Sequence, residues 1–412
     1  MPPSTEPATR TYVARQPILD LNERVFGYEL LYRHEATVHR RVSDGTPASD
    51  SVFTGALLDL GLDTVTGGRQ AFLNLTRPML LGHIDRLVPP DEIVIEVLAN
   101  VTVDDDVIEA CRMLHDKGYR LALDDFVPGS DAEALFPYVS FVKVDVLDTP
   151  VSVARSLPKE LSQHGIGMLA EKVENLATYH HMRMAGYSLF QGFFFCRPML
   201  QEAMALPPQK LAYLRLLAAM NKPDLSTCEV ERLVLKQDVS LSLRVLRSLN
   251  SAAYPIRTEM TSIGQALLLL GIEPIRRWVS AWCLAGLNGS ATPELATLAL
   301  LRARACELAS RRLSDIESSE LFLVGLFSLL DAMLSTPMTN AIERLPLSDG
   351  VKHALTGGSN TLRVLLDAVV QYERGDWDDA IATAARAGVD ALSLADAYTD
   401  ALRWVQDVTR GV

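Results

Sequence analysis

The chain lacks a surplus of positive charge. Its 412 residues include 39 Lys and Arg against 51 Asp and Glu, which gives a formal net charge of -12 at pH 7. Because nucleic acids are held mainly through their phosphates by clustered Lys and Arg, this balance argues against a protein that binds nucleic acid directly. An anionic ligand would instead need a bound metal ion or a few well-placed cations.

Cysteine is scarce and scattered. The five cysteines form no C-x-x-C pair and have no histidine at metal-ligand spacing; they are Cys111, Cys196, Cys228, Cys283 and Cys306. This pattern predicts neither a zinc site nor a disulfide framework. We interpret all five as buried thiols in a reducing compartment.

Long hydrophobic runs and a secretion signal are also missing. The first ten residues, "MPPSTEPATR", are polar and rich in proline, and the most apolar later stretch, residues 321–334, is short and contains Asp331. Neither segment has the length and composition of a signal peptide or a membrane span. We therefore expect a soluble, cytoplasmic protein with a disordered tail over residues 1–11.

Residues 12–203 repeat a pattern of a short apolar run, a polar residue at its end, and a helical stretch. The spacing of the run ends matches one β/α unit; they are Asn74, Glu96, Asp124 with Asp125, Lys143, Glu171 and Gln191. Two earlier runs, residues 12–18 and 24–33, are joined by a short turn and predict a hairpin. The sequence therefore predicts a modified TIM (β/α)8 barrel with one antiparallel strand.

Residues 204–412 have a different character, because strand-like runs disappear and Leu, Ala and Arg recur at helical spacing. Ser226 with Glu229 and Ser262 with Gln265 have the spacing of a helix capping box. The sequence predicts an all-α second domain.

The carboxyl ends of barrel strands meet at one mouth, which would gather the polar run ends. The oxygen-bearing residues there would be Glu29, Asn74, Glu96, Asp124, Asp125 and Glu171. Carboxylates this close raise each other's pKa unless cations intervene, and Mg²⁺ or Mn²⁺ takes such oxygen ligands. Two ions would suit attack of water on a phosphodiester, with Lys143 orienting or deprotonating that water or stabilising the phosphate. Taken singly, each acid could be only a helix cap and Lys143 only a surface lysine, but their shared register favours a site.

Several motifs resemble those of EAL domains, the barrel phosphodiesterases and receptors of cyclic di-GMP. "YELLYR", "LALDDF", "KVD", "AEKVE" and "QGFFFCRP" correspond to the family's E-A-L-L-R, D-D-F-G, K-I-D, A-E-G-V-E and Q-G-Y-x-F-x-x-P motifs. Residues 240–278 are similar to the HDOD domain, a helical signalling module related to HD-type hydrolases. The resemblance covers nearly the whole chain after residue 11.

The resemblance implies roles for individual residues. One ion would be held by Glu29, Asn74, Glu96 and Asp124, and a second by Asp124, Asp125 and Glu171. Lys143 would assist the attacking water, which makes Lys143, Glu29 and Asp124 the candidate catalytic set. Cyclic di-GMP would contact Gln16, Arg33, Gln191 and Asp125, with Glu174 supporting the metals from behind. Residues 201–412 contain a single histidine, His353, so an HD-type metal site is not expected there and the HDOD-like domain would act as a regulatory or interaction module.

Three departures from the family pattern bear on turnover. In active EAL enzymes a D-D-F-G-T-G loop, together with an acid three residues after the one matching Glu96, couples the ligand, the metals and the dimer. Here the loop reads "DDFVPGSD", and the position of that acid is occupied by Ala99. Loss of an anchor behind metal ligands commonly costs about 10- to 100-fold in metal affinity or activity. Lys172 also replaces the motif glycine, as is usual in the HDOD-fused branch.

These features predict a cyclic di-GMP receptor with weak or no hydrolysis that relays its state through the HDOD-like domain to a protein partner. Two alternatives stay open: an active phosphodiesterase that produces pGpG under control of the HDOD-like domain, and a scaffold that acts by protein contacts without the ligand. EAL barrels often pair through the face near the altered loop, so the resemblance also implies a homodimer.

Overall fold

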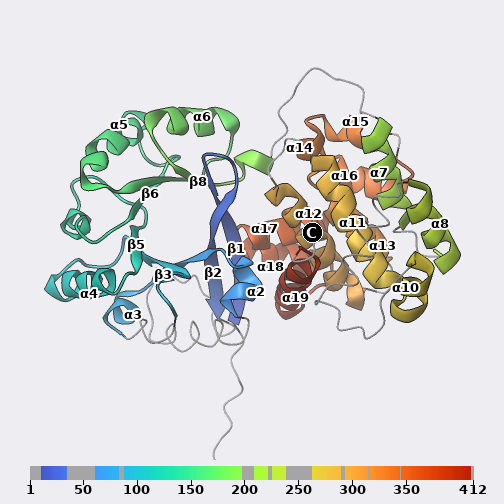
Figure 1. Ribbon diagram of the computed structural model, residues 1–412, viewed down its shortest axis with the longest axis horizontal. Coiled ribbons are helices and arrows are strands. Elements are labelled where there is room, and N and C mark those ends of the chain that lie inside the picture. The colour runs from blue at the N-terminus through green and yellow to red at the C-terminus, as the bar shows by residue number, and fades with distance from the viewer. Residues whose placement is uncertain are drawn as a thin grey trace, which may run out of the picture. The chain divides into compact units, whose positions relative to one another are not determined.

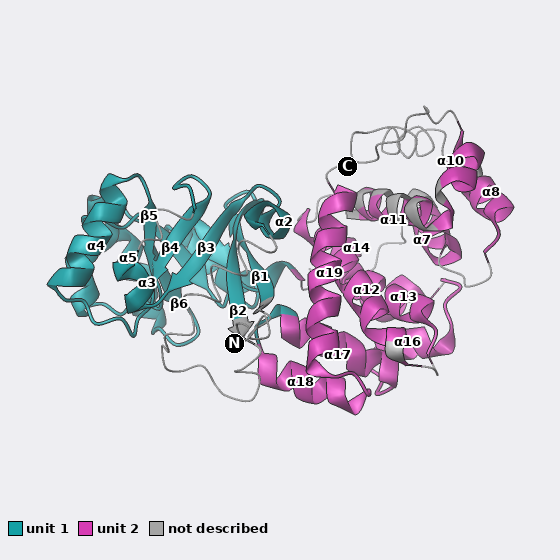
Figure 2. Ribbon diagram, turned by 90° about the horizontal axis from the view of Figure 1, so that it is seen from below, with its two compact units in different colours: residues 1–195, 373–375 teal, residues 196–372, 376–412 magenta. Residues whose placement is uncertain are grey.

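The computed structural model describes residues 11–34, 61–82, 88–196, 208–220, 225–237, 262–288, 293–313, 316–343 and 345–409. The chain divides into two compact units, residues 1–195 with 373–375 and residues 196–372 with 376–412 (Figure 2). The boundary predicted between residues 203 and 204 lies outside the described residues. The tail predicted over residues 1–11 also lies outside them, apart from Thr11, which belongs to the first strand.

The first unit is built on a closed barrel of eight strands in chain order (Figure 1). The strands are β1 (Thr11–Asp20), β2 (Val25–His34), β3 (Gln70–Leu75), β4 (Ile93–Val97), β5 (Arg120–Leu123), β6 (Phe141–Asp145), β7 (Gly167–Glu171) and β8 (Leu189–Gln191). β1 is antiparallel to both β2 and β8, whereas the other neighbours are parallel. The predicted modified TIM barrel with one antiparallel strand is confirmed.

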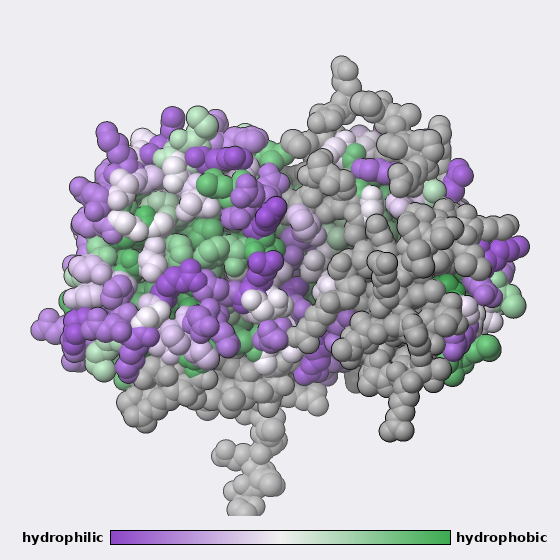
Figure 3. Space-filling model, in the orientation of Figure 1, coloured by the Kyte–Doolittle hydropathy of each residue, from purple (hydrophilic) through white to green (hydrophobic). Residues whose placement is uncertain are grey.

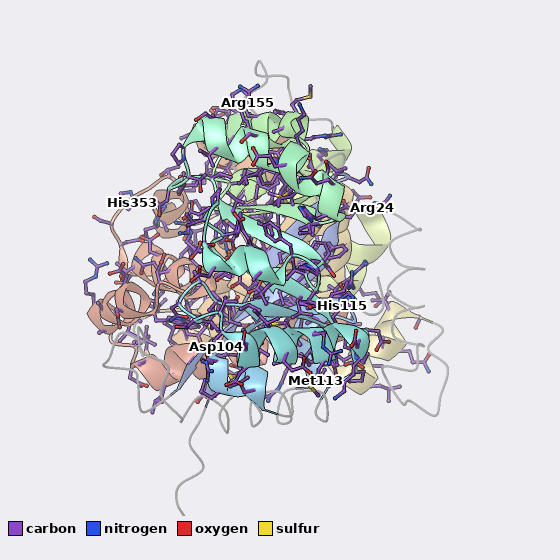
Figure 4. All side chains as sticks on the ribbon, turned by 90° about the vertical axis from the view of Figure 1, so that its left-hand side faces the viewer. Arg24, Asp104, Met113, His115, Arg155 and His353 are labelled. Carbon is purple, nitrogen blue, oxygen red and sulfur yellow. The ribbon has the colours of Figure 1, made fainter. Side chains whose placement is uncertain are left out.

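Helices follow the strands on the outside of the barrel (Figure 1). They are α2 (Leu62–Thr66), α3 (Arg77–Leu81), α4 (Asp105–Asp116), α5 (Val151–Leu161) and α6 (Leu176–Ala185), with 3₁₀ turns η3 (Asp131–Leu135), η4 (Ser162–His164) and η5 (Phe194–Cys196). The Asp104 carboxylate accepts the Val107 N–H at the start of α4, and Asn175 accepts the Thr178 N–H at the start of α6. Figure 4 shows Asp104 at the beginning of α4 and His115 near its end. Such caps satisfy N–H groups that have no partner within the helix and so fix where each helix begins.

The barrel interior is filled by one layer of apolar side chains. This layer consists of Ile18, Phe72, Val94, Ala122, Leu169 and Leu189, with Phe26 and Phe141 packed against it. Side chains two residues apart in a strand share a face, so the next inward residue after Phe72 is Asn74, after Val94 is Glu96, and after Leu169 is Glu171. β1 runs the opposite way, and its inward polar residue, Gln16, therefore precedes Ile18. We call this layer, with Phe26 and Phe141, the apolar floor; the polar residues of the mouth lie at the next inward positions beyond it.

The second unit is helical throughout its described residues. Its helices are α7 (Pro208–Met220), α8 (Thr227–Gln237), α10 (Ile263–Leu270), α11 (Ile272–Asn288), α12 (Glu294–Ala309), α13 (Ser318–Phe327), α14 (Leu330–Leu334), α15 (Met338–Ile342), α16 (Asp349–Leu355), α17 (Thr361–Glu373), α18 (Trp377–Arg386) and α19 (Ala391–Thr409), with the 3₁₀ turn η6 (Ser310–Arg312). The predicted all-α character is confirmed, and both predicted capping boxes form an N-cap hydrogen bond, from Glu229 N–H to Ser226 Oγ and from Gln265 N–H to Ser262 Oγ.

A close helix contact organises the core of this unit. A Cβ added at Gly325 of α13 would lie 2.5 Å from backbone atoms of Arg302 and Ala303 in α12. Because no real side chain can approach backbone so closely, glycine is required for this packing.

The cysteine prediction is confirmed in part. All five cysteines are free thiols, and Cys111, Cys283 and Cys306 are buried, but Cys196 is only half-buried and Cys228 is exposed. Cys228 lies in the first turn of α8, where its side chain meets solvent, so the expectation that all five are buried is wrong. None of the described helices combines the length and hydropathy needed to cross a membrane. Figure 3 shows polar and apolar residues interspersed over the visible face of the barrel.

Candidate functional site

Lys143 stands at the centre of the barrel mouth. Its side chain is fully buried, and its Nζ lies 2.7 Å from Glu96 Oε1, 2.7 Å from Asp124 Oδ1, 2.9 Å from Glu171 Oε1 and 3.4 Å from Glu29 Oε2. These four acids, here called the carboxylate ring, come from β2, β4, the end of β5 and β7. Lys143 reaches all of them because it lies on β6 and points inward, two residues beyond Phe141 of the apolar floor.

Three amide side chains complete the network on the Glu29 side. Asn74 Nδ2 donates to Glu29 Oε1 at 2.8 Å, and Gln191 Nε2 donates both to Glu29 Oε2 at 2.6 Å and to Gln16 Oε1 at 2.9 Å. The structure thus brings together eight of the residues predicted from the sequence: Gln16, Glu29, Asn74, Glu96, Asp124, Lys143, Glu171 and Gln191.

Three other predicted residues have no described place in this network. Asp125 follows Asp124 with a left-handed backbone (φ 44°), and its side chain is exposed at the rim. Glu174 is exposed beyond the end of β7. The backbone of Arg33 pairs with that of Tyr12 in the β1–β2 hairpin, but its side chain lies outside the described part of the structure.

Burial and charge pull the pKa values of the network in different directions. Burial by itself would lower the pKa of Lys143, but the four surrounding carboxylates outweigh it and raise this pKa well above its usual value. Burial raises the pKa of Glu96 well above its usual range and that of Glu171 to about 8, in each case against the attraction of Lys143. Glu29 is also desolvated, but Lys143, Gln191 and Asn74 together lower its pKa. The ammonium of Lys143 is therefore not enough to keep every acid of the ring ionised.

The donor chemistry of the mouth fits a hard divalent cation. Asn74 Oδ1 and Glu96 Oε2 are buried and accept no hydrogen bond, whereas Glu96 Oε1 is paired with the Lys143 ammonium at 2.7 Å. Buried oxygens without partners are costly unless a cation or donor meets them. Within the described ranges, no group of three or more His, Cys, Asp or Glu side chains is already arranged to hold a metal ion. We attribute this to the ammonium of Lys143, around which the carboxylate oxygens are gathered.

A pocket opens beside the ring, between the loops that follow β4 and β5. Its volume is about 320 Å³, and its lining includes Ala99, Asp124, Asp125 and Val127. Val127 is 65% exposed. The residue three positions after Glu96 therefore presents a methyl group to this pocket and not a carboxylate.

Sequence reasoning missed an ion pair at the same rim. Asp145, at the end of β6, is buried, and its Oδ2 lies 2.5 Å from Lys172 Nζ. Its Oδ1 accepts the backbone N–H groups of Leu147 and Asp148 at 2.8 and 3.2 Å. The sequence did contain an indication for Asp145: it lies two residues after Lys143, so its side chain points to the same side of the strand.

Solved structures that match part of the chain include complexes of cyclic di-GMP with a metal ion. The manganese and cyclic di-GMP complex of BlrP1 from Klebsiella pneumoniae at pH 9.0 matches 47% of this chain and 57% of that chain at 24% identity, with a TM-score of 0.38. The YkuI protein of Bacillus subtilis, with an EAL domain and in complex with cyclic di-GMP and calcium, matches 55% of this chain and 70% of that chain at 16% identity, with a TM-score of 0.39. The match to BlrP1 thus spans less than two thirds of that protein.

Family models and two relatives of similar length match the sequence itself. The EAL domain model matches residues 71–198 and the HDOD domain model residues 206–339. The cyclic di-GMP phosphodiesterase CdgJ of Vibrio cholerae is 33% identical over 404 residues, covering 97% of this chain and 93% of that protein. The uncharacterized protein YuxH of Bacillus subtilis is 32% identical over 409 residues, covering 97% of this chain and 99% of that protein. The chain belongs to the family of proteins that join an EAL domain to an HDOD domain.

Proposed function

We propose that this protein is a cyclic di-GMP receptor whose EAL barrel binds the dinucleotide together with divalent metal ions and hydrolyses it slowly or not at all. The observation that carries the proposal is the ring of four carboxylates around Lys143, next to a pocket in which Ala99 stands where an acid is expected. The relationship to a cyclic di-GMP phosphodiesterase over nearly the whole chain supports the choice of ligand.

The donors divide into two overlapping sets. Glu29, Asn74, Glu96 and Asp124 would hold one Mg²⁺ or Mn²⁺ ion, and Asp124, Asp125 and Glu171 a second. Such ions supply positive charge for the phosphodiester and polarise a water molecule.

Lys143 would act as a fixed positive charge at the mouth. In the arrangement seen here its pKa is raised by four carboxylates, so it keeps its proton and donates hydrogen bonds. This favours a role in orienting water or phosphate over a role as the base that deprotonates water.

Gln191 and Gln16 extend the site along β8 and β1. Gln191 holds the Glu29 carboxylate in place by a 2.6 Å hydrogen bond, which orients a donor of the first ion. Gln16 accepts a hydrogen bond from Gln191. As an amide near the rim, it would form hydrogen bonds to the edge of a guanine base of the ligand. Arg33 would contact a ligand phosphate, and Glu174 would support the metal region from behind.

The rim loops support slow turnover. Ala99 has no side-chain oxygen to hold the loop after β5, and in that loop Val127 is exposed and is followed by Pro128, whose ring restricts the backbone. Loss of the anchor behind a metal ligand commonly lowers metal affinity or activity about 10- to 100-fold, which supports slow hydrolysis.

The second candidate function is an active phosphodiesterase that releases pGpG. The specific observation in its favour is the 33% identity over nearly the full length with a protein named as a cyclic di-GMP phosphodiesterase. In either case the HDOD domain would relay the state of the barrel to a protein partner, and pairing of two barrels as a homodimer is part of the same proposal.

The direct test is a calorimetric titration of the full chain with cyclic di-GMP in Mn²⁺, Ca²⁺ or EDTA, with pGpG measured in the same samples. We expect metal-dependent binding with little product. Glu29→Gln should weaken binding, whereas Glu160→Gln, an exposed acid on α5, should not. Rapid product formation would favour the phosphodiesterase, and absence of binding in every condition would favour the scaffold.

A further inference from the structure

Lys172 lies immediately after Glu171 and has an unfavourable backbone conformation. Its φ is 53°, in the left-handed region that glycine adopts without penalty and that other residues rarely enter. Such a conformation persists only where the surrounding structure enforces it, and it concentrates at functional sites. The position therefore carries a lysine side chain where the backbone itself would prefer glycine.

The ammonium of Lys172 is held in one place. Its partner Asp145 has a side chain only 8% exposed and is fixed by two backbone N–H groups, from Leu147 and Asp148. The Lys172 side chain itself is 55% exposed, so its charge is in contact with solvent. A buried anchor thus positions a cation at the rim.

The charge of Lys172 also acts on Asp125, an acid of the second proposed metal set. The pKa of Lys172 is raised first by its hydrogen bond to Asp145 and then by the charges of Asp145, Asp125 and Asp148. Asp125 is exposed at the same rim and also has a left-handed backbone (φ 44°). Asp125, which belongs only to the second set, therefore lies within the field of this cation, and Glu171 directly precedes Lys172 in the chain.

We propose that the fixed positive charge of Lys172 weakens binding of the second divalent ion, the one assigned to Asp124, Asp125 and Glu171. The inference rests on the proposed function and deepens it. The ammonium of Lys172 and a second divalent ion at the same rim repel each other, so the second ion binds more weakly than the first. A single ion suffices to hold a phosphodiester, whereas in-line attack by metal-activated water is favoured by two. Lys172 is therefore a positioning residue that favours retention of the ligand over its hydrolysis.

The test measures metal affinity without substrate. The full chain is titrated with Mn²⁺, and free Mn²⁺ is followed by electron paramagnetic resonance for the wild type, Lys172→Gln, Lys172→Arg and Lys159→Gln. Lys159→Gln is the matched control, because it removes an exposed lysine from the last turn of α5. We expect one tight and one weak Mn²⁺ in the wild type, and about tenfold tighter binding of the weak ion in Lys172→Gln, as is common for groups behind metal ligands.

The expected pattern is specific. Lys172→Arg keeps the charge and should resemble the wild type, as should Lys159→Gln, and the tight ion should be unchanged in every variant. An unchanged affinity for the weak ion in Lys172→Gln, or an equal change in both ions, would overturn the inference while leaving the proposed function intact. Failure of all four proteins to bind Mn²⁺ would overturn both.

Discussion

Replacing Lys143 with methionine removes the ammonium from the centre of the carboxylate ring while nearly preserving the shape of the side chain. Lys143 Nζ lies within 3.4 Å of an oxygen of all four ring acids, and its side chain is fully buried. Removing one partner of a buried ion pair typically costs about 3–5 kcal/mol, because the other partner stays buried without compensation. Partial protonation of the ring offsets part of this cost, so we expect a loss of about 3 kcal/mol in the free energy of unfolding near neutral pH.

The loss should grow as the pH rises. Glu171 has a folded-state pKa of about 8 against a usual value of 4.5, so the folded protein holds more protons than the unfolded chain between these values. The contribution of such a group to stability is present below the unfolded pKa and is lost as the pH rises toward the folded pKa. Without Lys143 the pKa values of Glu171 and Glu96 rise further, and the decline becomes steeper. The pKa of Lys143 is itself raised, so in the wild type its stabilisation persists throughout this range.

The assay is urea unfolding of the full chain in EDTA, followed by far-ultraviolet circular dichroism and by tryptophan fluorescence. All four tryptophans, at positions 278, 282, 377 and 404, lie in the helical half, so fluorescence reports on that half and serves as an internal control. Lys143→Met should shift the circular dichroism transition and leave the fluorescence transition in place, with Lys159→Met behaving as the wild type. A variant within about 1 kcal/mol of the wild type at about pH 7.5, or a loss that shrinks with rising pH, would refute the reasoning.

Three further predictions follow from the same structure. Because metal ligands must be deprotonated, saturating Mn²⁺ at pH 7 should release at least one proton, since the pKa values of both Glu171 and Glu96 are raised, and the share from Glu171 should fall above pH 8. Calorimetry in buffers of different ionisation enthalpy measures this release, and no buffer dependence would contradict it. Gly325→Ala should destabilise the helical unit by about 1–3 kcal/mol in fluorescence-monitored unfolding, whereas Gly350→Ala, whose added Cβ meets only ordinary contacts, should cost less; equal costs would contradict the packing argument. Ala99→Glu should raise pGpG formation by about tenfold, and an unchanged rate would remove Ala99 from the explanation.

The two-residue period of a strand explains why so much of the mouth could be predicted. Asn74, Glu96, Glu171 and Gln191 each lie two residues beyond an apolar residue of the barrel floor, so one register assignment placed all of them. The hairpin before β3 was predictable from a different feature, the short turn between its two strands, which forces them to be antiparallel.

The sequence predicted Lys143 at the mouth, but it could not predict that one ammonium contacts all four ring acids, because a strand-end lysine can equally lie along the surface. The surroundings of Lys143 depend on five separate segments meeting at one point. The Asp145–Lys172 pair was missed because it joins the ends of two neighbouring strands, and its geometry requires the register that pairs Asp145 with Glu171. The exposure of Cys228 was missed because cysteine composition indicates average burial and not the face of a particular helix turn.

The most direct test of the central claim is a single-turnover assay, with the full chain in excess over cyclic di-GMP and Mn²⁺ at saturation, beside an active EAL phosphodiesterase under the same conditions. The account predicts that cyclic di-GMP stays bound to this protein and largely intact while the active enzyme converts it to pGpG. Conversion by this protein at a comparable rate would contradict the account.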